Sequence, residues 1–180
     1  TSRWIAEGAA RRDFVVTWHP FSLQVLNEGN AEASHVEAMR EGHQLGRVMV
    51  AVAEAHGSEG VGRLYDAVGT RRHPGGREDF DAVLTESLAE AGLPASLAEA
   101  AADDSRDAAL RASTRRGIEL VGPGVGIPII AIDGVAFFGP VISPAPTGDD
   151  ALTLWDGVRA AASIPGFFEL KRGREVGPQF

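Results

Sequence analysis

The residues best suited to chemistry or ligand binding fall into two short segments, of which the first is residues 18–27. Trp18 and His19 end an apolar run typical of a buried strand, and ligands of open α/β sheets gather beyond the carboxyl ends of strands. His19 is therefore either a donor to a ligand or a hydrogen-bonded structural histidine. Asn27 follows a second apolar stretch, and it either offers its amide to a substrate or caps a helix.

The second segment is Gly126-Ile127-Pro128, which opens another apolar run. Pro128 either begins a strand with a trans peptide bond, a position that proline often occupies, or forms a cis bond that shapes a tight loop. The preceding glycines, in residues 122–126, resemble a phosphate-binding loop only superficially. They lack the Lys and the Ser or Thr of that motif, and they precede a strand instead of a helix.

Several chemistries are excluded within these 180 residues. The sequence has no cysteine, so it holds no disulfide, zinc knuckle or thiol nucleophile. No Gly-x-Ser-x-Gly elbow supports a hydrolase. The remaining histidines lack metal-ligand spacing with each other or with acids, so we predict no metal site and interpret them as surface or packing residues: His35, His43, His56 and His73.

Charge and hydropathy narrow the classes of partner. The formal net charge is -8, and an acidic surface repels phosphate backbones, so no nucleic-acid partner is predicted. No apolar run approaches the roughly 20 residues that span a bilayer, so no membrane partner is predicted. No secretory signal pattern is visible. We therefore expect a cytoplasmic protein.

The elements that must position these residues form three parts. A helix over residues 1–10 leads into a buried strand over residues 13–19. Residues 30–120 carry apolar stripes at helical spacing and are predicted to be entirely helical, with a helix ending at Gly57. The third part is a strand over 126–132, an Asp133-Gly134 hairpin turn, a strand over 135–138 and a helix begun by Asp149 or Asp150.

This order predicts an α/β fold, namely a thioredoxin-like fold with an inserted all-helical subdomain. Residues 1–29 and 121–180 would form the thioredoxin-like domain, and residues 30–120 the insertion. One strand plus a hairpin leaves the middle of the sheet unpaired, and buried unpaired backbone groups are costly. We therefore expect either a strand that precedes Thr1 or a rearrangement of the three strands.

The chain resembles the DsbA-like oxidoreductases of the thioredoxin superfamily, and within them the actinobacterial mycothiol-dependent reductases, a group that includes a nitroreductase. The resemblance spans nearly the whole chain. It departs from the family in two places: the Cys-Pro-Trp-Cys motif that stands before the residues matching 1–4 is not in the sequence, and Ile127 replaces a common Thr or Val. The matching segments are residues 1–4, 22–23 with 26–28, 125–126 with 128, 133–141 and 167–172.

The resemblance implies a thiol-disulfide oxidoreductase that uses a low-molecular-weight thiol, mycothiol or glutathione, as cosubstrate, with no tightly bound cofactor. Its catalytic cysteines would lie upstream of Thr1, at the amino end of the first helix, where the helix dipole favours a thiolate. Pro128 would be cis and face the thiols, and the backbone of Ile127 would pair with an extended ligand. The implied site for substrate or thiol is Gly126, Ile127, Pro128, Trp18, His19 and Asn27.

Two other functions stay open. One is an isomerase of the 2-hydroxychromene-2-carboxylate type or a kappa-class glutathione transferase, relatives of the same superfamily, which would use a thiol in the cleft. The other is a non-catalytic binding protein that keeps the cleft. Apolar stretches such as residues 167–168 need cover, which favours a homodimer.

Overall fold

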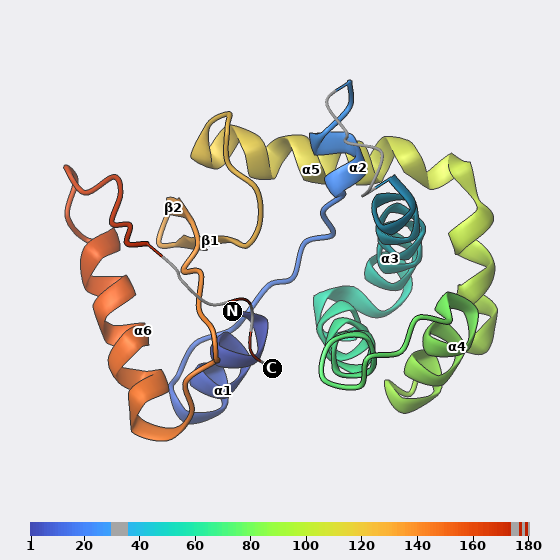
Figure 1. Cartoon of the computed structure of the whole chain (residues 1–180), viewed down its shortest axis with the longest axis horizontal. Helices are drawn as coiled ribbons and strands as arrows, with labels where there is room; N and C mark the ends of the chain where they lie inside the picture. Colours follow the sequence, from blue (N-terminus) through green and yellow to red (C-terminus); the bar gives the residue numbers. More distant parts are fainter. Residues whose placement is uncertain (30–35, 174–176, 178, 180) are drawn as a thin grey trace. The chain divides into compact units, whose positions relative to one another are not determined.

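The structure is a computed structural model that describes residues 1–29, 36–173, 177 and 179 (Figure 1). The chain divides into two compact units. Unit 1 comprises Thr1–Val16 and Ile118–Phe180, and unit 2 comprises Thr17–Gly117. Within the described residues no helix is long and apolar enough to cross a membrane. Each unit is described by itself below.

Unit 1 is built on two helices, α1 (Ser2–Arg11) and α6 (Gly148–Ala162). Trp4 is fully buried between them, and its indole Nε1 donates to the carbonyl oxygen of Ala151 at 2.8 Å. The Trp4 and Trp155 rings lie 6.3 Å apart. Arg11 pairs with Asp149 at 3.2 Å on the rim of this contact. The face of α1 that carries Trp4 is therefore the face that α6 covers.

The sheet of unit 1 is a hairpin of β1 (Ile129–Ile132) and β2 (Val135–Phe138), and it pairs Ile129 with Phe138 and Ile132 with Val135. Its turn is the predicted one. Asp133 has φ 50° and Gly134 has φ 88°, because a two-residue hairpin turn of this kind needs positive φ at both central positions.

The predicted strand over residues 13–19 is wrong. This segment is extended, but it joins no ladder, and the sheet in the described part of the chain has two strands. A strand is defined by its hydrogen-bonded neighbour, and among the described residues β1 pairs with β2 and not with residues 13–19. The local sequence favours an extended backbone, but it cannot supply a partner.

Unit 2 is helical. Its elements are α2 (Leu23–Leu26), α3 (Val36–Arg72), α4 (Phe80–Glu90), the 3-10 helices η2 (Ala95–Ala102) and η3 (Asp104–Arg106), and most of α5 (Asp107–Val121). Gly57 interrupts α3 with φ 68° and ψ -175°, so the predicted helix end there is a break after which the helix resumes. The apolar core gathers side chains from α3, α4 and η2, among them Val52, Leu64, Leu84 and Leu88.

Gly46 on α3 is required by close packing. A Cβ atom at this position would lie 2.8 Å from Leu110 Cδ2, and Leu110 is fully buried. We expect Gly46→Ala to lower the free energy of unfolding by about 1–2 kcal/mol, because overpacking of a core forces side chains out of their rotamers. Gly42→Ala, one turn earlier on the same helix, has no neighbour within 4 Å and is the control. It should be neutral or stabilising in urea denaturation, and equal effects of the two substitutions would contradict the assignment.

Candidate functional site

The amino end of α1 and the loop before β1 lie at the same end of unit 1. Thr1 Oγ1 donates to the carbonyl oxygen of Pro140 at 2.6 Å. Gly139, the residue before Pro140, donates its backbone N–H to the carbonyl oxygen of Pro128 at 2.7 Å. The Ile127–Pro128 peptide bond is cis, as predicted, and the Ile127 side chain is 42% exposed. Gly126, Ile127 and Pro128 thus stand beside the start of a helix.

The electrostatics of this end favour an anion. Thr1 provides no side-chain cap for α1, and the first turn holds no acidic residue, so the unpaired amides and dipole of the helix end are not offset. Arg3 adds a positive charge in the same turn. A thiolate or carboxylate placed here would be stabilised by the same charges.

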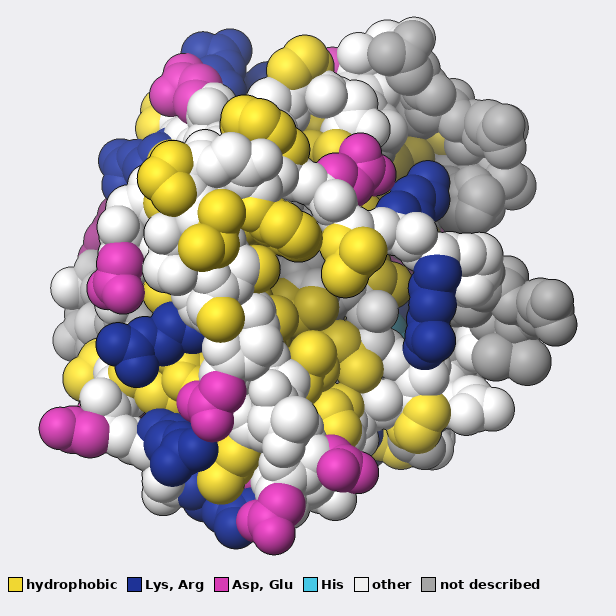
Figure 2. Space-filling view, turned by 90° about the vertical axis from the view of Figure 1, so that its left-hand side faces the viewer, with side chains coloured by type: hydrophobic (Ala, Val, Ile, Leu, Met, Phe, Trp, Pro, Cys, Tyr) yellow, Lys and Arg dark blue, Asp and Glu magenta, His cyan; other side chains and the backbone are white. Residues whose placement is uncertain are grey.

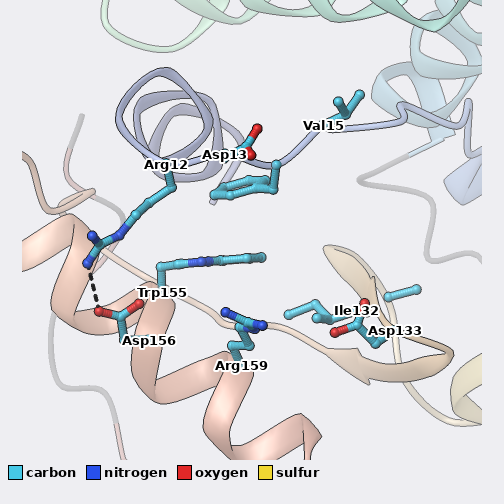
Figure 3. A pocket seen from close by; sticks show the side chains of 10 residues that line it. Arg12, Asp13, Val15, Ile132, Asp133, Trp155, Asp156 and Arg159 are labelled. Carbon is cyan, nitrogen blue, oxygen red and sulfur yellow. Dashed lines mark hydrogen bonds and ion pairs between the residues drawn. The ribbon is translucent and has the colours of Figure 1, made fainter.

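A cavity of about 680 Å³ opens elsewhere in unit 1 (Figure 3). Its lining includes the Phe14 and Trp155 rings, which are stacked with centroids 4.1 Å apart. Arg12 pairs with Asp156 at 2.9 Å along one side of it. The opposite side is formed by residues 131–133 of the hairpin. Half of the lining residues are charged, so the cavity combines two apolar rings with both acidic and basic groups.

Apolar side chains are also exposed on unit 1. Figure 2 shows exposed hydrophobic side chains in yellow. The most exposed of them are Val15 at 92%, Leu170 at 89% and Phe168 at 84%.

In unit 2 the segment Trp18–Asn27 is held by polar contacts to the helices. Ser58 Oγ contacts the backbone of Trp18. Ser113 Oγ donates to the carbonyl oxygen of Pro20 at 2.6 Å. The Trp18 ring stacks on Tyr65 with centroids 6.0 Å apart. His19, between these anchors, is exposed.

Trp18 packs directly on Gly62 of α3. A Cβ atom at Gly62 would lie 2.5 Å from Trp18 Nε1, so we expect Gly62→Ala to displace the indole from its stack on Tyr65. The displaced ring should be more exposed, and the Trp18 contribution to the emission spectrum should shift to the red and become more accessible to iodide quenching. The control is Gly69→Ala on the same helix, which has open space around it. An unchanged spectrum for Gly62→Ala would contradict the packing.

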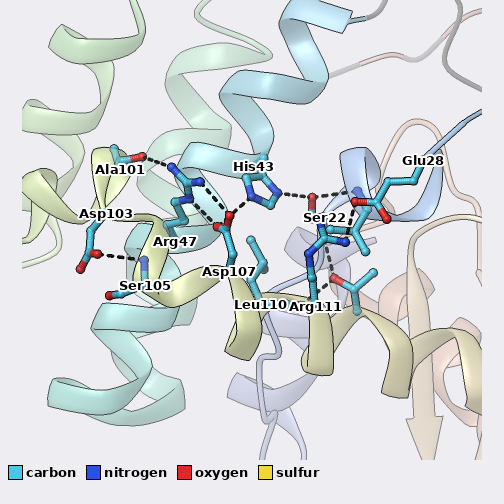
Figure 4. Close-up of polar contacts among 12 residues, drawn as sticks. Ser22, Glu28, His43, Arg47, Ala101, Asp103, Ser105, Asp107, Leu110 and Arg111 are labelled. Atoms are coloured by element: carbon cyan, nitrogen blue, oxygen red, sulfur yellow. Dashed lines mark hydrogen bonds and ion pairs between the residues drawn. The ribbon is translucent and has the colours of Figure 1, made fainter.

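A buried polar chain links α2, α3 and α5 in unit 2 (Figure 4). Ser22 Oγ lies 2.8 Å from His43 Nδ1, and His43 Nε2 lies 3.0 Å from Asp107 Oδ1. Arg47 makes two hydrogen bonds to the same carboxylate, at 2.6 and 2.9 Å. Arg47, then His43, hold the pKa of Asp107 down at about 2. His43 is buried, which agrees with the packing role that was one of the two predicted for it, but its contact with Asp107 was not predicted.

This chain of groups has the residue types of a hydrolase triad but not its function. Ser22 is fully buried, so no substrate reaches its hydroxyl. The hydroxyl also accepts a hydrogen bond from the backbone N–H of Val25, as the cap of α2. The charge of the Asp107 carboxylate is balanced by the Arg47 guanidinium, so this carboxylate does not act on the histidine alone. The network fixes the end of the Trp18–Ser22 segment to the helices.

Comparison with known proteins places the chain in a family. The sequence profile of the Rv2466c-like family, described as Mycothiol-dependent nitroreductase Rv2466c, matches residues 1–172. The chain belongs to the Rv2466c-like family. It is also 31% identical over 182 residues to the Uncharacterized protein Rv2286c of Mycobacterium tuberculosis, a match that covers 96% of this chain and 75% of that protein.

For this member of the Rv2466c-like family, the predicted site residues fall into both units. Gly126, Ile127 and Pro128 lie together in unit 1, and Trp18 and His19 are adjacent in unit 2. Asn27 caps the carboxyl end of α2, where its Nδ2 donates to the carbonyl oxygen of Leu23 at 2.8 Å. The sequence left open whether Asn27 contacts a substrate or caps a helix. The structure shows it as a cap, at the carboxyl end of α2.

Sequence reasoning missed the residues that line the cavity of unit 1 and those of the buried network of unit 2. Phe14 lies in the strand predicted over residues 13–19 and Trp155 in the helix predicted after Asp149 or Asp150, and no local pattern indicates that their rings stack. The network had a weak signal, because His43 and Arg47 are one helical turn apart and share a face. Their partner Asp107 is 64 residues from His43, and no spacing rule connects them.

Proposed function

We propose that this protein is a thiol-dependent oxidoreductase that uses mycothiol as its electron donor. Membership of the Rv2466c-like family over residues 1–172 carries the proposal. Within the proposal, the fold is thioredoxin-like, with residues 1–29 and 121–180 forming the catalytic domain and residues 30–120 an inserted helical subdomain. Gly126, Ile127 and Pro128 bind the thiol or substrate beside the amino end of α1, and Trp18, His19 and Asn27 are candidate substrate-binding residues of unit 2.

The reacting thiols are proposed to be cysteines joined to the chain ahead of Thr1. A thiolate there would stand at the amino end of α1, whose free amides and Arg3 stabilise negative charge. It attacks a substrate disulfide, forms a mixed disulfide and releases one thiol, and the second cysteine then resolves the mixed disulfide. Two mycothiol molecules restore the dithiol, and they lose two electrons and two protons as they form one disulfide.

The first test is the intact mass of the protein from its natural source, measured with and without iodoacetamide. We expect a mass above 18.9 kDa and the addition of alkyl groups to thiols. A mass that matches the 180 residues with no alkylation would overturn the redox mechanism and leave a binding protein with this fold.

The second test uses the thiol-bearing protein without alkylation and locates the site within it. Ile127→Glu should slow mycothiol-dependent disulfide reduction at least tenfold, because a carboxylate beside the α1 amino end repels a thiolate. The matched control is Val135→Glu. Val135 is 39% exposed, against 42% for Ile127, and lies at the turn end of the same hairpin. Equal rates for the two variants would place the chemistry elsewhere.

A further inference from the structure

The short helix α2 is anchored through its capping residue. None of its four residues is buried, whereas Ser22, the residue that caps it, is fully buried. The backbone N–H of Ser22 donates to Thr114 Oγ1 at 3.0 Å, and Ser22 Oγ lies 2.8 Å from His43 Nδ1. Isolated helices shorter than about 12–15 residues are marginal in water. The order of α2 therefore depends strongly on the contacts of Ser22.

Asn27 is tied to the same helix. Its backbone N–H donates to the carbonyl oxygen of Leu23 at 3.0 Å, and its side-chain Nδ2 donates to that oxygen at 2.8 Å. Leu23 is the residue that follows Ser22. A displacement of α2 would therefore also move the Asn27 amide, which is one of the candidate substrate-binding groups of unit 2.

The hydrogen bonds that join α5 to α2 run in one direction. The Asp107 carboxylate is held ionised by Arg47, and an ionised carboxylate only accepts, so His43 Nε2–H donates to it at 3.0 Å. In a neutral imidazole the other nitrogen is an acceptor, so the Ser22 hydroxyl donates to His43 Nδ1. The Ser22 oxygen in turn accepts from the backbone N–H of Val25 at 3.3 Å. A second proton on the ring would make Nδ1 a donor and take this acceptor from the Ser22 hydroxyl.

We propose that His43 is a positioning residue, which accepts the Ser22 hydroxyl proton and thereby holds α2 and Asn27 in place for the substrate. The proposal rests on the proposed function, because it takes Asn27 as a substrate-binding residue. Every contact on which it depends lies within unit 2. Asp107 sets the orientation and tautomer of the ring, and its own charge stays paired with Arg47.

Two amide substitutions separate the two contacts of His43. His43→Asn places an amide oxygen where Nδ1 lies, so it keeps an acceptor for Ser22 and loses the contact with Asp107. His43→Gln places an amide nitrogen where Nε2 lies, so it keeps a donor to Asp107 and loses the acceptor for Ser22. If His43 only joined α3 to α5, His43→Gln would be the milder change. If it positions α2, His43→Asn is the milder one.

Amide hydrogen exchange at Val25, read by NMR, reports on the cap of α2 without any assay of activity. We expect His43→Gln to speed this exchange about tenfold, the effect of losing about one hydrogen bond. His43→Asn should change it by less than about threefold. The control is His56→Gln, which replaces an exposed histidine of the same helix and should leave Val25 unchanged.

The second readout is the reduction of hydroxyethyl disulfide by the thiol-bearing protein, with mycothiol as the electron donor. We expect His43→Gln to raise the KM for this disulfide about fivefold with little change in kcat, because a displaced binding group weakens the ground state and the transition state alike. His43→Asn should stay close to the parent protein. A defect of folding alone would lower the active fraction, and so kcat, without a change in KM.

Two results would overturn the proposal. One is exchange at Val25 that is as fast in His43→Asn as in His43→Gln, which would show that the contact with Asp107 is the one that matters. The other is an unchanged KM in His43→Gln despite faster exchange, which would show that α2 places no group for the substrate. A parent protein without mycothiol-dependent activity would overturn the proposed function, and the exchange at Val25 would still decide whether His43 holds α2.

Discussion

Replacement of Trp4 by Ala should lower the free energy of unfolding of unit 1 by about 3–5 kcal/mol, the usual cost of removing a large buried aromatic side chain. Trp4 is completely buried, contacts Trp155 and makes one hydrogen bond to the backbone of α6. These contacts join the first helix of the chain to the last. Guanidinium denaturation followed by near-UV circular dichroism would measure the loss.

Trp4→Phe is the matched control for this substitution. It keeps an aromatic ring in the site but removes the donor to Ala151, so the expected cost is about 1–2 kcal/mol, close to that of one buried hydrogen bond. A cost below about 1 kcal/mol for Trp4→Ala would show that the contact between α1 and α6 does not hold unit 1 together.

The second large effect is expected at Asp107. Asp107→Asn removes the charge that faces Arg47, whose side chain is 16% exposed, and it weakens the contact to buried His43. Removal of one partner of a fully buried ion pair costs 3–5 kcal/mol. Because the Asp107 side chain is 29% exposed, solvent screening reduces this, and we expect about 2–3 kcal/mol at pH 7.

The effect of Asp107→Asn should also depend on pH. Arg47, and after it His43, lower the pKa of Asp107 from 3.8 to about 2. A carboxyl group whose pKa is lower in the folded state stabilises that state above its unfolded pKa. Its contribution falls away as the pH drops from 3.8 toward 2. Urea denaturation of both proteins between pH 7 and pH 2.5 should therefore show their stabilities converging on the acid side.

Asp66→Asn provides the control for this experiment. Asp66 is an exposed acid on α3, so its replacement should change stability by no more than about 0.5 kcal/mol at any of these pH values. A difference between Asp107→Asn and the parent protein that stays constant down to pH 2.5 would contradict the proposed ionisation of Asp107.

Much of the local structure could be predicted from the sequence. The Asp133-Gly134 turn and the interruption of α3 at Gly57 both depend on residues within a few positions of one another. Turn chemistry and capping act over this short range. Local spacing alone did not decide whether the Ile127–Pro128 bond is cis or trans. The resemblance implied a cis bond, and the bond is cis.

The predicted strand over residues 13–19 failed for the opposite reason. Its apolar, β-branched residues make an extended backbone favourable, and the segment is extended. A ladder needs a second chain segment at the correct distance, and neither hairpin strand lies against this one. Propensity within one segment carries no information about whether that partner is present.

The sequence by itself determined the helices, the hairpin and its turn, and the absence of thiol groups from these 180 residues, because each follows from residue type or from short spacing. Only the tertiary structure decided that His43 meets Asp107 across 64 residues and that Phe14 and Trp155 stack and line one cavity with residues 131–133. These depend on contacts between distant segments, which form when the apolar faces of helices and strands are buried together and which no local pattern encodes.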